Sequence, residues 1–153
     1  MGVDTWALDY GLLGAGDALI GNPYHYRDRR TEGIAAKMLA RVSADEVYQT
    51  TGNPLMPFAT LGQLFSAVCA DAPALRVAQT LLTMPDLFNF WLSGQKVCES
   101  SHVINTQCYD PRARTWATDL AGKLDIPGHI FPPVVAPGTI LGNLVPAVVE
   151  ETG

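Results

Sequence analysis

The chain has 153 residues, of which 48% are hydrophobic and 16% are charged, and its formal net charge is −5. Such a chain lacks the basic excess that supplies affinity for nucleic acid or for an anionic membrane surface, so we expect neither as a partner. The length is sufficient for one domain with a real core. Because a typical soluble domain carries about 25% charged residues, the low charge here predicts a domain that packs against further protein.

Cysteine, histidine and hydropathy patterns narrow the class of protein further. The three cysteines are odd in number and form no CxxC pair, which argues against an extracellular disulfide framework. The three histidines lie far apart and none has ligand spacing with a cysteine, so no metal site is predicted. We find neither a signal-peptide pattern nor an apolar run of roughly 18 residues, and we expect a cytoplasmic protein.

The first 21 residues show the pattern of a β-hairpin. A turn at Gly14-Ala15-Gly16-Asp17 separates two groups of strand-forming residues, which are Trp6, Leu8, Leu12, Leu13, Leu19 and Ile20. Although Gly14 and Gly16 form a GxG pair, no third glycine opens a helix, so a turn is favoured over a phosphate-binding loop. Because a two-stranded hairpin is marginal alone, we expect its Asp4 end to pair with strands that the chain lacks.

Five or six short helices are predicted after the hairpin. Thr31 is expected to cap the first, and the capping box Ser43-Ala44-Asp45-Glu46 begins the second. Thr60 is expected to cap the third, in which apolar residues recur at helical spacing. The predicted helical ranges are 31–41, 43–51, 60–69, 74–82, 86–92 and 115–122. The proline-rich segment 126–152 is predicted to be a loop with a short strand.

No complete catalytic motif is visible, since the sequence lacks a GxSxG elbow, a Walker-type loop and an HExxH pair. Carboxylates do occur near aromatic residues: Asp4, Asp9 and Asp28 with Trp6, Tyr24, Tyr26 and Phe58. This mixture suits a polyol, because ring faces pack on C–H groups while carboxylates bind hydroxyls. From the residues alone, we favour a structural role in which Asp9 and Arg27 or Asp28 pair and hold the hairpin to the first helix.

Six segments, in order, carry a further pattern: Gly2–Leu13, Gly21–Thr31, Tyr48–Gly52, Pro57–Thr60, Met84–Gly94 and Thr106–Asp110. Each segment alone is moderately specific. The ordered set, which covers nearly the whole chain, resembles the FGGY carbohydrate kinases. Within that family, Asp4-Thr5-Trp6 and Tyr26-Arg27-Asp28 favour the members that act on L-rhamnulose.

The resemblance implies an α/β fold, a fragment of an actin-like (RNase H-like) sugar kinase domain with one β-hairpin, several short helices and a late short strand. It implies two domains in the whole protein, with the sugar mainly on the first and ATP on the second. The implied reaction moves the γ-phosphoryl group of MgATP to the 1-hydroxyl of L-rhamnulose, in L-rhamnose breakdown. Residues 1–153 would be an internal part of the first domain, with the ATP-binding domain absent and other kinase segments packed on it.

The resemblance also implies which residues contact the ketose: Trp6, Ala7, Asp9, Arg27, Asp28, Phe58 and Thr60. The catalytic base belongs to a His-Asp-Thr motif expected beyond Gly153, so we expect no catalytic residue here. The full-length family uses ATP and Mg, but we expect no site for either, and no metal ligand, on this chain. Three places depart from the family pattern. Ala7 stands where glycine is usual, Ala59 stands where asparagine is usual, and the segment Ser101–Gln107 differs from one that is usually rich in threonine.

We therefore expect an ATP-dependent sugar kinase fragment that is inactive alone. Two alternatives stay open at this point. One is a non-catalytic remnant or a module that binds a sugar or a protein partner. The other is a kinase for a different ketose, such as xylulose or fuculose.

Overall fold

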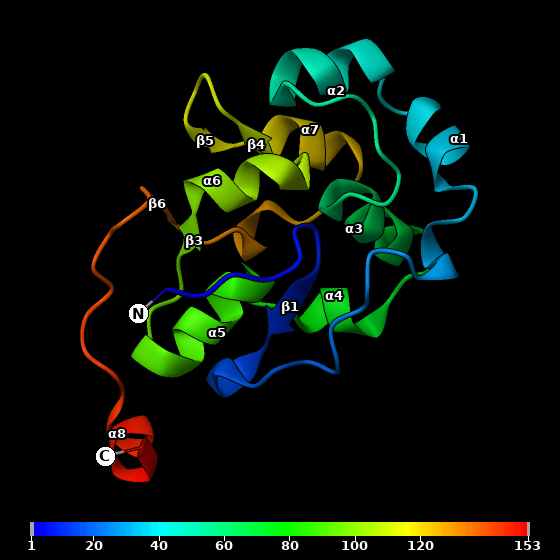
Figure 1. Cartoon of the computed structure of the whole chain (residues 1–153). Coiled ribbons are helices and arrows are strands. Elements are labelled where there is room, and N and C mark those ends of the chain that lie inside the picture. Colours follow the sequence, from blue (N-terminus) through cyan, green and yellow to red (C-terminus); the bar gives the residue numbers. More distant parts are fainter. Residues whose placement is uncertain (1, 153) are drawn as a thin grey trace.

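The structure is a computed structural model that describes residues 2–152 (Figure 1). Its helices are α1 (Ile34–Leu39), α2 (Ala44–Thr51), α3 (Thr60–Cys69), α4 (Pro73–Val77), α5 (Met84–Ser93), α6 (Ser100–Val103), α7 (Thr118–Lys123) and α8 (Pro146–Thr152). Its strands are β1 (Tyr10–Leu13), β2 (Thr80–Thr83), β3 (Cys98–Glu99), β4 (Tyr109–Asp110), β5 (Thr115–Trp116) and β6 (Val134–Val135). Short 3-10 helices lie at Ala15–Asp17, Arg29–Thr31, Ile104–Thr106 and Gly128–Ile130.

Residues 2–152 form three two-stranded sheets, of which two join segments that are distant in the sequence and the third, β4–β5, is a local hairpin. Strand β1 pairs antiparallel with β2, in a register that runs from Tyr10 opposite Thr83 to Leu13 opposite Thr80. Strand β3 runs parallel to β6, and β4 runs antiparallel to β5. All four residues of β1 are buried, and helix α5 packs on the β1–β2 pair. In Figure 1, β1 lies centrally, whereas α8 lies at the end of an extended segment.

The predicted hairpin over residues 2–21 is largely wrong. Residues 2–9 form no strand, and β1 is joined to the segment after the turn only by one bridge between Leu13 and Leu19. The partner of β1 is instead β2, most of which was predicted to be helix. A short apolar run such as Thr80–Thr83 fits a helix or a strand equally well by periodicity, and only pairing with the distant β1 decides between them.

Some of the predicted helix boundaries agree with the structure and others do not. Ser43 caps α2 as predicted, because its hydroxyl accepts a 3.0 Å hydrogen bond from the Glu46 amide. Thr31 does not cap a helix, since it ends a 3-10 turn and α1 begins only after Gly33, which has a φ of 73°. The expected late strand is present as β6, and Thr115–Trp116, predicted to open a helix, pairs as β5.

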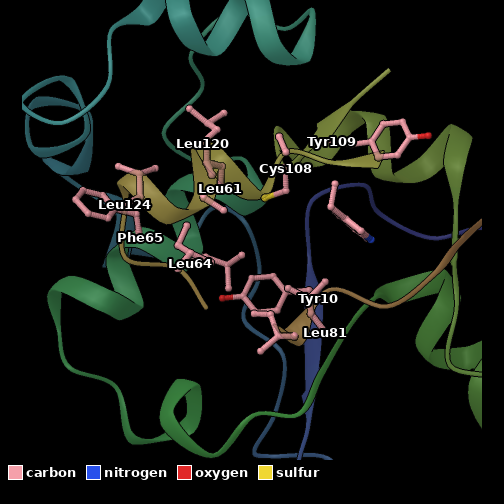
Figure 2. Packing of buried hydrophobic residues seen from close by; sticks show 14 of the residues in the cluster. Tyr10, Leu61, Leu64, Phe65, Leu81, Cys108, Tyr109, Leu120 and Leu124 are labelled. Atoms are coloured by element: carbon pink, nitrogen blue, oxygen red, sulfur yellow. The ribbon is translucent and has the colours of Figure 1, made fainter. Parts of the chain in front are cut away.

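The hydrophobic core forms around α3, whose residues from Thr60 to Ser66 are all buried. Figure 2 shows side chains of α3 packing with others from distant segments: Tyr10, Leu61, Leu64, Phe65, Leu81, Leu120 and Leu124. The mixed α/β content agrees with the predicted class. The first two turns of α3 thus lie in the core, behind the candidate site described below.

Over residues 2–152, the structure contains no helix that is both long and apolar enough to cross a membrane.

Candidate functional site

Four aromatic rings from three separate segments form a row at one surface of the molecule. The Trp6 and His25 rings meet edge to face with centroids 6.3 Å apart, and His25 and Tyr26 are 4.5 Å apart. Tyr26 and Phe58, which are distant in the sequence, are 6.1 Å apart. Trp6 is 67% exposed and Phe58 is 41% exposed. The row therefore presents apolar ring surface to solvent.

An open cavity of about 450 Å³ lies beside Tyr26 and Phe58. Its remaining lining is polar at most positions: Arg27, Asp28, Arg29, Thr31, Glu32 and Pro57. The Arg27 guanidinium lies 5.3 Å from the Tyr26 ring centroid and its Nε donates to the Tyr26 hydroxyl at 2.9 Å. Three residues predicted to contact a ligand, Arg27, Asp28 and Phe58, thus share one cavity with a neighbouring aromatic row.

Thr60 does not reach this cavity and has a supporting position instead. It is almost fully buried in the first turn of α3, and its hydroxyl donates to the Leu8 carbonyl at 2.8 Å. Leu8 has a φ of 84°, a left-handed conformation that costs a branched residue free energy. Half-buried Ala7 lies in the same bend, next to Trp6. Thr60 therefore holds the backbone on which Trp6 and Ala7 are presented.

Asp9 is also behind the surface, at 5% exposure. Its Oδ1 atom is buried and has no hydrogen-bond partner within residues 2–152. Burial raises the pKa of the Asp9 carboxyl, while the Tyr26 backbone amide and the nearby His25 and Arg30 act in the opposite direction. The predicted pairing of Asp9 with Arg27 or Asp28 is wrong, because the basic side chains that influence Asp9 are His25 and Arg30.

Sequence reasoning missed Arg30 and Gln63, which connect the parts of this site. The Arg30 guanidinium lies 4.2 Å from the Tyr24 ring centroid and donates to Gln63 Oε1 at 2.5 Å. Gln63 is 0% exposed and also donates to two backbone carbonyls. The available signal was a large amide side chain, three positions after Thr60, on a mostly apolar helix, since buried amides require partners.

Helix α3 approaches the loop at Pro57 unusually closely at Gly62. A Cβ atom built on Gly62 would lie 2.0 Å from the Pro57 carbonyl oxygen and 2.7 Å from its carbon. Only glycine allows the two backbones to approach this far. Ala59 occupies the capping position at this end of α3 and is fully buried. Its side chain is therefore not accessible to a ligand at the surface.

A second buried polar cluster lies at the start of α5, apart from the cavity. Asp86 accepts a hydrogen bond from the Thr83 hydroxyl and another from the Glu99 amide at 3.2 Å. Burial raises the pKa of Asp86 above its ordinary value of 3.8, against the effect of these bonds. Burial lowers the pKa of the neighbouring His102. The negative charges of Asp86, Glu99 and Asp4 act in the opposite direction, but burial has the larger effect.

We expect Asp86→Asn to remove a pH-dependent part of the stability. A carboxyl whose pKa is raised on folding contributes stability below the unfolded pKa of about 3.8, and this contribution is lost as pH rises through the folded pKa. The free energy of unfolding of the native chain minus that of the variant should therefore fall with rising pH and then level out. Urea denaturation from pH 3.5 to 7 measures this difference, and a difference that grows with pH would contradict the expectation.

Sugar kinases of known structure have this fold. A gluconate kinase from Lactobacillus acidophilus superposes with a TM-score of 0.85 at 21% identity, covering 95% of this chain and 30% of that protein. Plasmodium falciparum glycerol kinase, solved with ADP, superposes with a TM-score of 0.86 at 11% identity, covering 98% of this chain and 31% of that one. At such identities the likeness shows the fold alone. It confirms the predicted fold class, which is mixed α/β.

The chain belongs to the FGGY family of carbohydrate kinases, because the model of the family's N-terminal domain matches residues 1–153. The rhamnulokinase of Pectobacterium atrosepticum is 39% identical over 145 residues, which are 94% of this chain and 29% of that protein. The rhamnulokinase of Enterococcus faecalis is 36% identical over 151 residues, covering 99% and 30%. That of Oceanobacillus iheyensis is 32% identical over 153 residues, covering 100% and 33%. The predicted resemblance is confirmed, and the chain spans about a third of these relatives' length.

Proposed function

We propose that this chain supplies the ketose-binding wall in the first domain of an L-rhamnulose kinase, of which residues 1–153 form an internal part. The cavity that brings Arg27, Asp28 and Phe58 together is the observation that carries this proposal. The rhamnulokinases among the relatives support L-rhamnulose as the substrate. In the whole protein, acting in the cytoplasm, the γ-phosphoryl group of ATP would pass to the 1-hydroxyl of the ketose.

The chemistry of the cavity suits a polyol with an apolar face. The Phe58 and Tyr26 rings offer surface for C–H groups, while the exposed Asp28 carboxylate accepts hydrogen bonds from hydroxyls. Arg27 keeps its terminal N–H donors available, because within the described residues its guanidinium donates a hydrogen bond through Nε alone. These groups bind and orient a sugar. Trp6, at the other end of the aromatic row, extends the apolar surface.

ATP and Mg are proposed for the whole protein, not for a site on this chain. Within residues 2–152 no group of three or more histidine, cysteine, aspartate or glutamate side chains could hold a metal ion. Asp28 and Glu32 are the two carboxylates at the cavity, and they do not fit an octahedral magnesium site by themselves. None of the three histidines precedes an Asp-Thr pair, so we assign proton abstraction to no residue here and propose that the chain alone is inactive.

Replacing Phe58 by alanine should weaken binding of L-rhamnulose by about tenfold, because a ring that packs on the sugar is removed. Isothermal titration of the purified chain with L-rhamnulose, xylulose and fuculose measures the affinities and the ranking among the ketoses. Phe88→Ala is the matched control, since Phe88 is 42% exposed against 41% for Phe58 but lies on α5, away from the cavity lining.

Equal affinities for Phe58→Ala and the native chain would contradict the proposed site. Tighter binding of xylulose or fuculose than of L-rhamnulose would reassign the substrate. Ketose-dependent ATP hydrolysis by the 153-residue chain would overturn the proposal that the chain alone is inactive.

A further inference from the structure

The candidate site is built from three segments that are far apart in the sequence, and one buried side chain contacts all of them. Gln63 Nε2 donates to the Leu8 carbonyl at 3.1 Å and to the Phe58 carbonyl at 2.9 Å. Gln63 Oε1 accepts from the Arg30 guanidinium at 2.5 Å. Gln63 is fully buried in the first turn of α3 and does not line the cavity itself.

Each of these hydrogen bonds fixes a different wall of the site. The Leu8 carbonyl belongs to the left-handed bend that follows Trp6 and Ala7. The Phe58 carbonyl belongs to the residue whose ring borders the cavity. Arg30 directly follows the lining residues 26–29, and its position is further fixed by stacking on Tyr24.

A glutamine amide is well matched to these three partners. It offers two N–H donors and an acceptor oxygen on one planar group, and here both kinds of atom are used. Glutamate would keep the acceptor for Arg30 but lose both donors, and methionine would keep the approximate volume but lose all three bonds. Because Gln63 itself is fully buried, either substitution removes bonds made inside the protein, and without its donors the Leu8 carbonyl keeps only the bond from Thr60.

We propose that Gln63 is a positioning residue of the sugar site: it holds the Trp6–Leu8 segment, the Phe58 loop and the Arg30 segment in register with one another. The inference rests on the proposed function, since it assigns Gln63 a role in ketose binding. A residue that served only the overall stability of the fold would not alter the site in chains that remain folded.

The test replaces Gln63 by methionine and follows the three tryptophans of the chain by ¹⁹F NMR after 5-fluorotryptophan labelling. Trp6→Phe assigns the Trp6 signal. We expect Gln63→Met to shift or broaden the Trp6 resonance, leave those of Trp91 and Trp116 in place, and weaken L-rhamnulose binding by about tenfold or more. If Gln63→Met does not fold, Gln63→Glu serves in its place, since it keeps the bond to Arg30.

Thr51→Val is the matched control for the loss of buried hydrogen bonds. The Thr51 hydroxyl is almost fully buried in α2, donates to the Val47 carbonyl at 2.9 Å and accepts from the Asn53 amide at 3.2 Å. We expect this variant to lower the melting temperature without changing the Trp6 resonance or the affinity.

An unchanged Trp6 resonance and unchanged affinity in a folded Gln63 variant would overturn the proposal and leave Gln63 a purely structural residue. If the native chain binds no ketose, the proposed function fails for this chain, and the Trp6 resonance alone then decides whether Gln63 holds the segment. The two failures are therefore distinguishable.

Discussion

Gly62→Ala is expected to lower the free energy of unfolding by about 3 kcal/mol or more. The added Cβ would lie 2.0 Å from the Pro57 carbonyl oxygen, 2.7 Å from its carbon and 3.1 Å from its Cα. All three are backbone atoms, so no side-chain rotation relieves the contact and α3 must move away from the loop. Because Phe58 follows Pro57 directly, the same displacement should open the candidate site. Urea denaturation measures the loss of stability.

Gly122→Ala is the control for this substitution. Gly122 lies within α7, where an added Cβ meets no atom within 4 Å. Alanine is favoured over glycine inside a helix by about 0.5–1 kcal/mol, so this variant should be slightly more stable than the native chain. Similar stabilities for the two alanine variants would show that the close approach of α3 to Pro57 does not exist in solution.

Leu81→Ala is expected to cost about 3 kcal/mol of unfolding free energy, within the range for deletion of a fully buried leucine. Leu81 lies opposite Leu12 in the β1–β2 pair and is 0% exposed. Figure 2 shows its side chain close to Tyr10 in the core. The substitution removes apolar contacts and leaves a cavity that rigid neighbours fill only in part. Thermal and urea denaturation both report the effect.

Ile140→Ala provides the comparison at an exposed position. Ile140 is 90% exposed, so its truncation removes almost no buried surface and should change stability by less than about 0.5 kcal/mol. A Leu81→Ala variant as stable as Ile140→Ala would show that β2 does not pack in the core as described.

Local signals in the sequence predicted the start of α2 but not the other two expected caps, since Thr31 ends a 3-10 turn and Ala59, rather than Thr60, is the capping position of α3. The cap at Ser43 needs only Glu46 three residues later, so its position could be read directly. The fold family could also be predicted, because ordered motifs along the whole chain carry it. The strand at Thr80–Thr83 could not, since its conformation depends on β1, about 70 residues earlier. Its helix-like spacing was outweighed by tertiary pairing.

The candidate site also has a part that the sequence predicts and a part that it does not. The aromatic residues and the Arg27-Asp28 pair could be identified as a group, and the structure brings Phe58 beside them. Their contact with a sugar stays a prediction. The supporting bonds could not be foreseen, because Gln63 and Thr60 reach Leu8 across more than 50 residues and act on a backbone carbonyl that carries no sequence signal.

The left-handed backbone at Leu8 has a consequence for local stability that we expect to be measurable. Residues 2–8 belong to no strand, and we expect this segment to detach from the surface more readily than β1 leaves the core. The strain at Leu8 favours detachment, and the bonds from Thr60 and Gln63 oppose it. The amides of this segment should therefore exchange with solvent through local opening rather than global unfolding. A ligand that contacts Trp6 binds only while the segment is in place, so part of its binding free energy is spent on ordering the segment. The affinity at this surface should therefore rise when the segment is better ordered.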